Sequence, residues 1–193
     1  MIILGSTLNN SPVMGLQTGS ELARTERPII DPKNLGVVAY VVKGPLLDHH
    51  TPSLLRIADV RELSDLGFIV DSSDEFIAPD DVIKIHDIYS LNFNLVGMHV
   101  TDERRNKLGK VIDFTLDTSG FIVQQLSVRR PLFHTFSDTE LLIHRTQIIE
   151  INDDAIVVHS EAKAPELERH QVPGSYVNPF RKSEPAPDQT VVS

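Results

Sequence analysis

An internal repeat limits the folds that this chain can adopt. A shift of 86 residues places Asp31 on Asp117, and after a two-residue insertion a shift of 88 places residues 68–70 on residues 156–158. Solenoid repeats are shorter, about 20 to 50 residues, so the pattern predicts a duplicated small domain. A chain of 193 residues has room for two such domains. The same shifts superpose Leu22, Val37, Val42 and Pro45 on Leu108, Val123, Val128 and Pro131, and residues 60–63 on residues 148–151.

Both copies have the composition of short strands separated by turns. In the second copy, Leu108–Leu116 and Phe121–Val128 are rich in branched apolar residues and alternate well enough to bury one face. The corner between them, residues 117–120, begins with Asp and ends with Gly, and residues 31–34 match it with Asp and Asn. Such an Asp bonds its own following backbone, while Gly or Asn accepts a positive φ. Five or six short strands in each copy predict a small barrel, because closure removes exposed edges.

The sequence therefore predicts a mainly β chain with two small β-barrels in tandem. We expect a first barrel over 1–73, a short helical linker over 74–94, a second barrel over 95–161 and a tail over 162–193. The linker is too apolar to be free, so it should pack against one or both barrels. The tail holds five of the twelve prolines and too little apolar surface to order itself, so we expect it to be disordered. The linker's apolar residues are Ile83, Ile85, Ile88 and Leu91.

The second copy resembles the PRC-barrel family. Residues 95–128 and 141–158 have its pattern, which is a Gly before the first strand, Leu-Gly-Lys-Val after a polar turn, an Asp-led corner and a late Ile-x-x-Ile-x-Asp. The family includes the cytoplasmic domain of the photosynthetic reaction-centre H subunit and the C-terminal domain of the ribosome maturation factor RimM. The motif consists of turn and core residues, so it indicates a fold and no active site. The resemblance implies a protein-docking module, in a tandem arrangement typical of bacterial proteins.

The first copy departs from this pattern at two positions. Ala23 stands where the second copy has Gly109, and Pro28 interrupts its second strand. Because Pro cannot donate a hydrogen bond to a neighbouring strand, we expect a bulge or a sheet edge at Pro28.

Composition excludes several classes of chemistry. The chain has no Cys, which rules out disulfides, Cys-ligated zinc and thiol catalysis. No apolar run approaches the ~18 residues of a membrane span, and the N-terminus does not resemble a signal peptide, so we expect a soluble cytoplasmic protein without membrane insertion. The net charge of −9, most of it carried by residues 1–90, argues against a general nucleic-acid coat.

Candidate catalytic and metal-binding groups are few. Asp48-His49-His50 places three possible metal ligands in one loop, with His134 at the position matching Asp48. Adjacent ligands leave the coordination incomplete and no further ligand has a recognised spacing, which favours solvated histidines. The chain has no G-x-S-x-G and no Gly-rich phosphate loop. We therefore predict no catalytic residue, no metal and no cofactor.

A basic cluster is the remaining feature. Duplication leaves it on the second copy only, because the first copy keeps a base only at Arg24 and Lys43. The functional interpretation is an anion-seeking patch for an acidic protein or structured RNA, and the alternative is a solvated turn with ordinary charges. The candidate partner-binding residues are Arg104, Arg105, Lys107, Lys110, Arg129 and Arg130.

These observations lead to three hypotheses about function. The first is a non-enzymatic binding or adaptor module that docks a protein partner through the basic turn. The second is a ribosome- or RNA-associated maturation factor, and the third is an enzyme with a site between the barrels. The sequence leaves open the identity of the partner and whether the chain forms a homo-oligomer.

Overall fold

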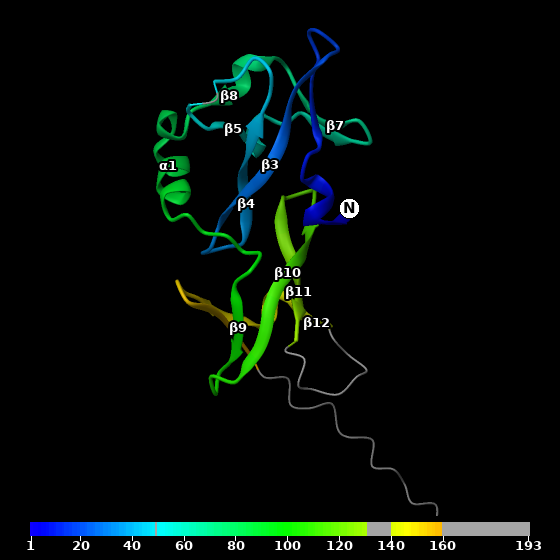
Figure 1. The fold of residues 1–193 in the computed structure, drawn as a ribbon. Coiled ribbons are helices and arrows are strands. Elements are labelled where there is room, and N and C mark those ends of the chain that lie inside the picture. The colour runs from blue at the N-terminus through cyan, green and yellow to red at the C-terminus, as the bar shows by residue number, and fades with distance from the viewer. Residues whose placement is uncertain (49, 131–139, 160–193) are drawn as a thin grey trace, which may run out of the picture. The chain divides into compact units, whose positions relative to one another are not determined.

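Strands dominate the part of the chain that the computed structural model describes, namely residues 1–48, 50–130 and 140–159 (Figure 1). The mainly β fold predicted from the sequence is confirmed. The disorder predicted for 162–193 concerns residues outside the described part. The strands are β1 (Ile2–Leu4), β2 (Pro12–Gly15), β3 (Glu21–Asp31), β4 (Gly36–Lys43), β5 (Ser53–Arg56), β6 (Glu62–Ser64), β7 (Gly67–Val70), β8 (Phe76–Ile77), β9 (His99–Asp102), β10 (Lys107–Asp117), β11 (Ile122–Arg129), β12 (Glu140–His144), β13 (Ile148–Ile151) and β14 (Ala155–Val158), and the helix is α1 (Ile83–Ser90).

Two segments, the first half (residues 12–70) and the second half (residues 99–158), have the same order of paired strands. It runs β6-β7-β2-β3-β4-β5 in the first half and β13-β14-β9-β10-β11-β12 in the second. In each half one pair is parallel, β2 with β7 and β9 with β14, and the other pairs in this order are antiparallel. Each strand of the first half thus has a counterpart in the second.

The register of the long hairpins, β3–β4 and β10–β11, also agrees. Arg24 lies opposite Lys43 as Lys110 lies opposite Arg129, a shift of 86 on both strands. Pro28 lies opposite Tyr40 and is flanked by two register shifts. The same two shifts flank its counterpart in the second half, which is a phenylalanine, so Pro28 is not their cause. The shifts fall at Thr25/Arg27 and Ile29/Ile30, and at Val111/Asp113 and Thr115/Leu116.

The predicted closure into two barrels is not confirmed. The hydrogen-bonded strands form an open path that begins at β6 and ends at β13, and it continues from the first half to the second through β4 and β11. In each half a 3₁₀ turn directly follows the strand that pairs with the long hairpin, which is β5 in the first half and β12 in the second. The turns are Ile57–Asp59 and Arg145–Gln147. Among the described residues, the strand that follows each turn, β6 or β13, pairs only with β7 or β14. The described sheet is therefore open.

The two halves meet at the tips of their long hairpins. The Val37 amide donates to the Phe121 carbonyl oxygen over 2.8 Å, and the Val123 amide donates to the Leu35 carbonyl oxygen over 3.0 Å. Because Leu35 and Val37 correspond to Phe121 and Val123 under the 86-residue shift, each tip gives the other the same hydrogen bond. The tips thus form a two-fold-like junction.

Both tips have an unusual backbone conformation at the residues whose carbonyl oxygens accept these hydrogen bonds. The Asp31 side chain accepts a hydrogen bond from the Lys33 amide and the Asp117 side chain from the Ser119 amide, as predicted for Asp-led corners. The positive φ predicted at Asn34 and Gly120 falls one residue later, at Leu35 (φ 60°) and Phe121 (φ 49°). A left-handed conformation at a residue with a side chain costs roughly 1–2 kcal/mol. Burial of both side chains and the reciprocal hydrogen bonds offset this cost.

A single apolar cluster extends through both halves. The ring centroid of Phe121 lies 6.2 Å from that of Phe68, which lies 5.2 Å from that of Tyr40. The second half's corner residue therefore contributes to an aromatic group of the first half. Burial raises the pKa of the Tyr40 hydroxyl, which has no hydrogen-bond partner among the described residues. Phe68 and Tyr40 are fully buried.

The N-terminal segment also joins the halves, a feature that the sequence did not predict. Strand β1 precedes the first half in the chain but pairs with β10 of the second, with Ile2 opposite Asp117. The backbone amide and hydroxyl of Ser6, in the 3₁₀ turn Gly5–Leu8, donate to the Asp113 carboxylate over 3.1 and 2.5 Å.

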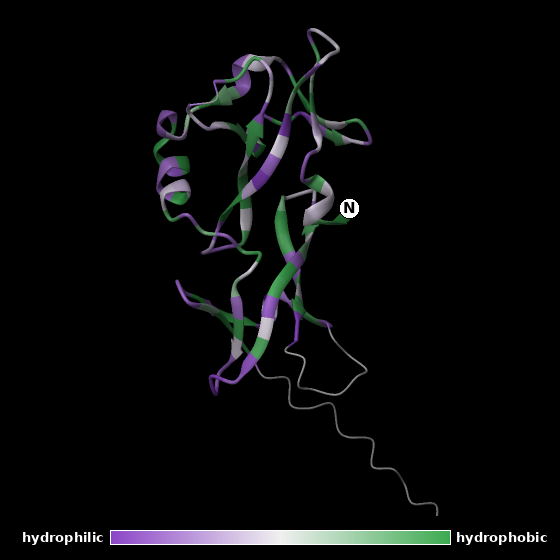
Figure 2. Ribbon diagram, viewed as in Figure 1, coloured by the Kyte–Doolittle hydropathy of each residue, from purple (hydrophilic) through white to green (hydrophobic). Residues whose placement is uncertain are grey.

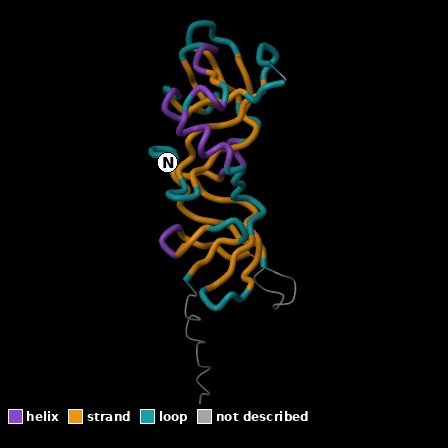
Figure 3. Tube along the Cα trace, turned by 90° about the vertical axis from the view of Figure 1, so that its left-hand side faces the viewer, coloured by secondary structure: helices purple, strands orange, loops and turns teal. Residues whose placement is uncertain are grey.

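The linker packs on the first half, as the apolar pattern predicted. Strand β8 pairs with β5, and α1 buries Ile85 in a second apolar cluster with Ile29, Ala39, Val41 and Leu54 (Figures 1 and 3). In the second half the positions that match three of these residues are polar. They are Thr115, Gln125 and Ser127.

The junction can be tested by truncation of one buried ring. Phe121→Ala should lower the free energy of unfolding by about 3 kcal/mol, because it removes a buried phenylalanine from a core shared by both halves. Urea denaturation measures this loss. Phe76→Ala, the same change at a partly buried position away from the tips, should cost less. A loss below about 1 kcal/mol for Phe121→Ala would contradict the junction's role.

Candidate functional site

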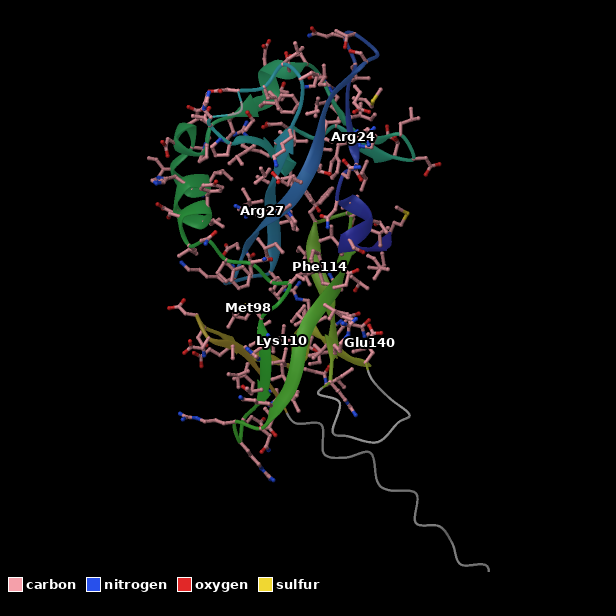
Figure 4. The ribbon with its side chains drawn as sticks, in the orientation of Figure 1. Arg24, Arg27, Met98, Lys110, Phe114 and Glu140 are labelled. Carbon is pink, nitrogen blue, oxygen red and sulfur yellow. The ribbon has the colours of Figure 1, made fainter. Side chains whose placement is uncertain are left out.

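Four of the six predicted basic residues line one cleft of about 680 Å³ in the second half. Lys107 and Lys110 come from β10, Arg129 comes from β11, and Arg130 follows it directly. Figure 4 labels Lys110 on β10. The other lining residues are Val96, Gly97, His99, Gly109, Val111 and Ile112. We call this the basic cleft. The pairing of β10 with β11 thus brings together residues about twenty positions apart in the sequence.

Arg104 and Arg105 do not line the basic cleft. They lie in the turn between β9 and β10, which Figure 2 shows as strongly hydrophilic. The buried carboxylate of Asp102 organises this turn, since it accepts hydrogen bonds from the Arg104 amide over 2.9 Å and from the Asn106 amide and side chain over 2.8 Å each. The bond from the Asn106 side chain is the main reason that the pKa of Asp102 lies below its usual value.

The register explains how the cations of the cleft come together. His99, Lys110 and Arg129 lie opposite one another on β9, β10 and β11. Directly opposed residues of neighbouring strands project from the same face, with Cβ atoms about 5 Å apart. Glu140 of β12 extends the row beyond Arg129. All four side chains are exposed. The row therefore presents a basic surface that ends in one acid.

The floor of the cleft is apolar and depends on a glycine. Val111 is buried, whereas Val96 is 42% exposed. Gly109 has a φ of 154°, and a Cβ atom there would lie 2.1 Å from the carbonyl oxygen of Arg129. A side chain at this position would therefore force β10 and β11 apart beneath the two arginines. At the matching crossing of the first half the glycine is on the other strand, at Gly44, where a Cβ would lie 2.4 Å from the Leu22 carbonyl oxygen.

The cations of the cleft lack the ion pairs that their first-half counterparts have. Arg24 matches Lys110 and binds Glu21, with 2.7 Å from both its Nε and its Nη2 to the carboxylate oxygens. Lys43 matches Arg129 and binds Glu26 over 2.5 Å. Within residues 1–48, 50–130 and 140–159, none of the six predicted basic residues forms an ion pair. The six basic residues thus form no ion pair in the described chain, although their row ends in Glu140, opposite Arg129.

The other candidate groups show no comparable site. Asp48 accepts hydrogen bonds from the His50 amide and the Thr51 hydroxyl, over 2.9 Å each, which is turn chemistry. His49 and His134 lie outside the described residues. Among the described side chains no group of three or more His, Asp and Glu could hold a metal ion. In the same part of the chain, no helix is long and apolar enough to cross a membrane.

Sequence reasoning missed the apolar half of the site. Val111 and Ile112 lie within the strand predicted over residues 108–116, and no pattern in the sequence marks Val96 or His99 as part of a site. The signal was available in the repeat, because Ile112 stands where the first copy has Glu26. An apolar residue at a position that carries an acid in the other copy marks a surface with a different role.

Comparison with known proteins adds no family assignment. No protein-family model matches the chain. A search of curated proteins likewise finds no match.

The glycine under the cleft gives a matched stability test. Gly109→Ala should lower the free energy of unfolding by more than about 1 kcal/mol, because the new Cβ would meet backbone atoms. Gly120→Ala is the control, since a Cβ there lies 3.4 Å from its nearest neighbour, an ordinary contact with the Ile122 side chain. Thermal or urea unfolding of both variants measures the difference. Equal effects would show that β10 and β11 do not cross closely at Gly109.

Proposed function

We propose that the chain consists of two PRC-type domains in tandem and acts as a non-enzymatic adaptor that docks a protein partner in the basic cleft. The duplicated strand order and the matching register shifts support the tandem arrangement. The proposal keeps the cytoplasmic location predicted from the sequence. It rests above all on one observation: four cations of the second half surround an apolar floor without intramolecular ion pairs among the described residues.

The chemistry of the cleft suits a protein better than a nucleic acid. Protein interfaces combine an apolar centre with a polar or charged rim, which is the arrangement of Val111 and Ile112 beside the lysines and arginines. Nucleic-acid sites depend chiefly on phosphate neutralisation, and the net charge of −9 opposes a polyanion over most of the surface. An RNA or a ribosomal particle is therefore the rival partner.

An enzymatic site between the halves has less support. One cavity that includes residues from both halves, such as Arg27 and Asp113, measures about 180 Å³. Another, of about 610 Å³, takes only Pro32 from the first half. The Asp113 carboxylate already accepts two hydrogen bonds from Ser6. Arg27 lies over the Tyr89 ring, 5.6 Å from its centroid. These groups hold β10 and α1 in place, which favours a structural role.

Charge reversal in the cleft tests the proposed function. The double variant Lys110→Glu/Arg129→Glu should lose the proteins that the wild-type chain retains from a lysate of the source organism, while its melting temperature stays nearly unchanged. The reason is that both side chains are exposed, so their reversal changes the charge of the surface and leaves the core intact. Quantitative mass spectrometry of the retained proteins, with and without nuclease treatment, measures the effect.

Lys33→Glu/Lys84→Glu is the matched control, because it makes the same change in charge at exposed lysines outside the cleft. It should retain the same proteins as the wild type. Unchanged retention by the cleft variant would refute docking there. Loss of retention on nuclease treatment would favour the RNA-associated alternative.

A further inference from the structure

The first half shows which chemical group binds to cations at the positions that correspond to the cleft. Arg24 and Lys43 are opposed on β3 and β4 as Lys110 and Arg129 are on β10 and β11. In the first half each of these cations forms an ion pair with a carboxylate. Glu21 makes a two-point contact with Arg24, and Glu26 binds Lys43. A planar carboxylate is the partner that matches the guanidinium fork in this geometry.

The second half has lost both of these carboxylates. Under the 86-residue shift, Glu21 corresponds to Lys107 and Glu26 corresponds to Ile112. The backbone at these positions is equivalent, since residues 26 and 112 both lie within the first register shift of their strands. The first substitution replaces an acid by a base, and the second adds apolar surface to the cleft. The second half thus keeps the cations without the two carboxylates that bind them in the first half.

We propose that the basic cleft binds a short acidic peptide segment whose two carboxylates replace those of Glu21 and Glu26, and whose apolar side chain, on the same face of the peptide, lies against Val96 and Ile112. This inference rests on the proposed function and names the element of the partner that is recognised. Phosphate would satisfy the charge, but it supplies no group for the apolar floor.

The geometry limits the peptide further. Neighbouring strands lie about 4.8 Å apart, so Lys110 and Arg129 present their charges within reach of carboxylates at positions i and i+2 of an extended peptide, which are roughly 7 Å apart. The acid at Glu140 follows Arg129 in the row and repels a further carboxylate on that side. Alternate side chains of an extended peptide share one face, so an apolar residue that reaches the floor stands two positions from a Glu. The preferred ligand is therefore an extended segment with the pattern Val-x-Glu-x-Glu, in which x is small and polar, that lies over His99, Lys110 and Arg129.

A titration of the ¹⁵N-labelled chain, followed by NMR, tests this inference. The probe is the capped peptide Gly-Val-Ser-Glu-Ser-Glu-Gly, and two control peptides replace both Glu by Gln or the Val by Gly. The acidic peptide should shift the amide signals of Lys107, Lys110 and Arg129, the Gln peptide should not bind, and the Gly peptide should bind several-fold more weakly. Equal binding of the Gln and Glu peptides would overturn the inference, as would shifts confined to other residues.

The strongest test of the cations introduces the two acids of the first half at the corresponding positions of the second half. Lys107→Glu/Ile112→Glu should supply internal carboxylates to Lys110 and Arg129 and weaken peptide binding at least tenfold. Because Ile112 is half-buried, Lys107→Glu alone and Lys110→Gln/Arg129→Gln serve as milder variants, and each should weaken binding several-fold. The matched control Lys33→Glu should leave the affinity unchanged.

Binding to all cleft variants at wild-type affinity would overturn the role of these cations. Stronger binding of a single-stranded oligouridine than of the acidic peptide to the same residues would show that the cleft prefers phosphate to carboxylate. That result would also overturn the inference. If no acidic peptide binds while protein retention from lysate still depends on Lys110 and Arg129, the docking function stands and the carboxylate ligand is wrong.

Discussion

The described structure depends on two hydrogen bonds between the tips of the long hairpins. They join Val37 to the Phe121 carbonyl and Val123 to the Leu35 carbonyl, and they continue the sheet from β4 to β11. They require a left-handed backbone at two bulky residues, a conformation that becomes stable only when both side chains are buried. Since each tip supplies the donor, the acceptor and the buried side chain that the other needs, the junction forms as a unit. The N-terminal strand β1 then adds a second connection by pairing with β10.

The two halves share the strand arrangement of this two-fold-like frame and differ in other features. Strand order, register shifts and Asp-led corners are common to both, so they serve folding. The differences lie on the surface. In the first half α1 covers one face, and two cations form ion pairs with Glu21 and Glu26. In the second half Lys110 and Arg129 are exposed beside an apolar floor. One copy therefore contributes mainly stability, and the other presents the proposed docking surface.

Much of this frame could be predicted from the sequence, because it depends on local patterns. The strands of the second half and the Asp-led corners followed from alternation and turn chemistry, and the 86- to 88-residue shifts gave the register of one half from the other. Other features could not be predicted. The pairing of β1 with the second half depends on a distant partner, and so does the choice of the first half for the packing of α1. The positive φ at Leu35 and Phe121 depends on burial in the junction, which outweighs the preference for Asn and Gly one residue earlier. The apolar floor of the basic cleft was not recognised, since its residues have the composition of ordinary strands.

Amide hydrogen exchange at the hairpin tips measures whether the two hydrogen bonds between them hold the halves together. If the reciprocal hydrogen bonds hold the halves together, the Val37 and Val123 amides should exchange together and as slowly as amides at the centres of β4 and β11, because they open only when the junction itself opens. The Lys33 and Ser119 amides, which bond only within their own corners, should exchange much faster. Exchange of Val37 and Val123 at the rate of these corner amides, or at rates that differ widely from each other, would show that the reciprocal hydrogen bonds do not hold the halves together.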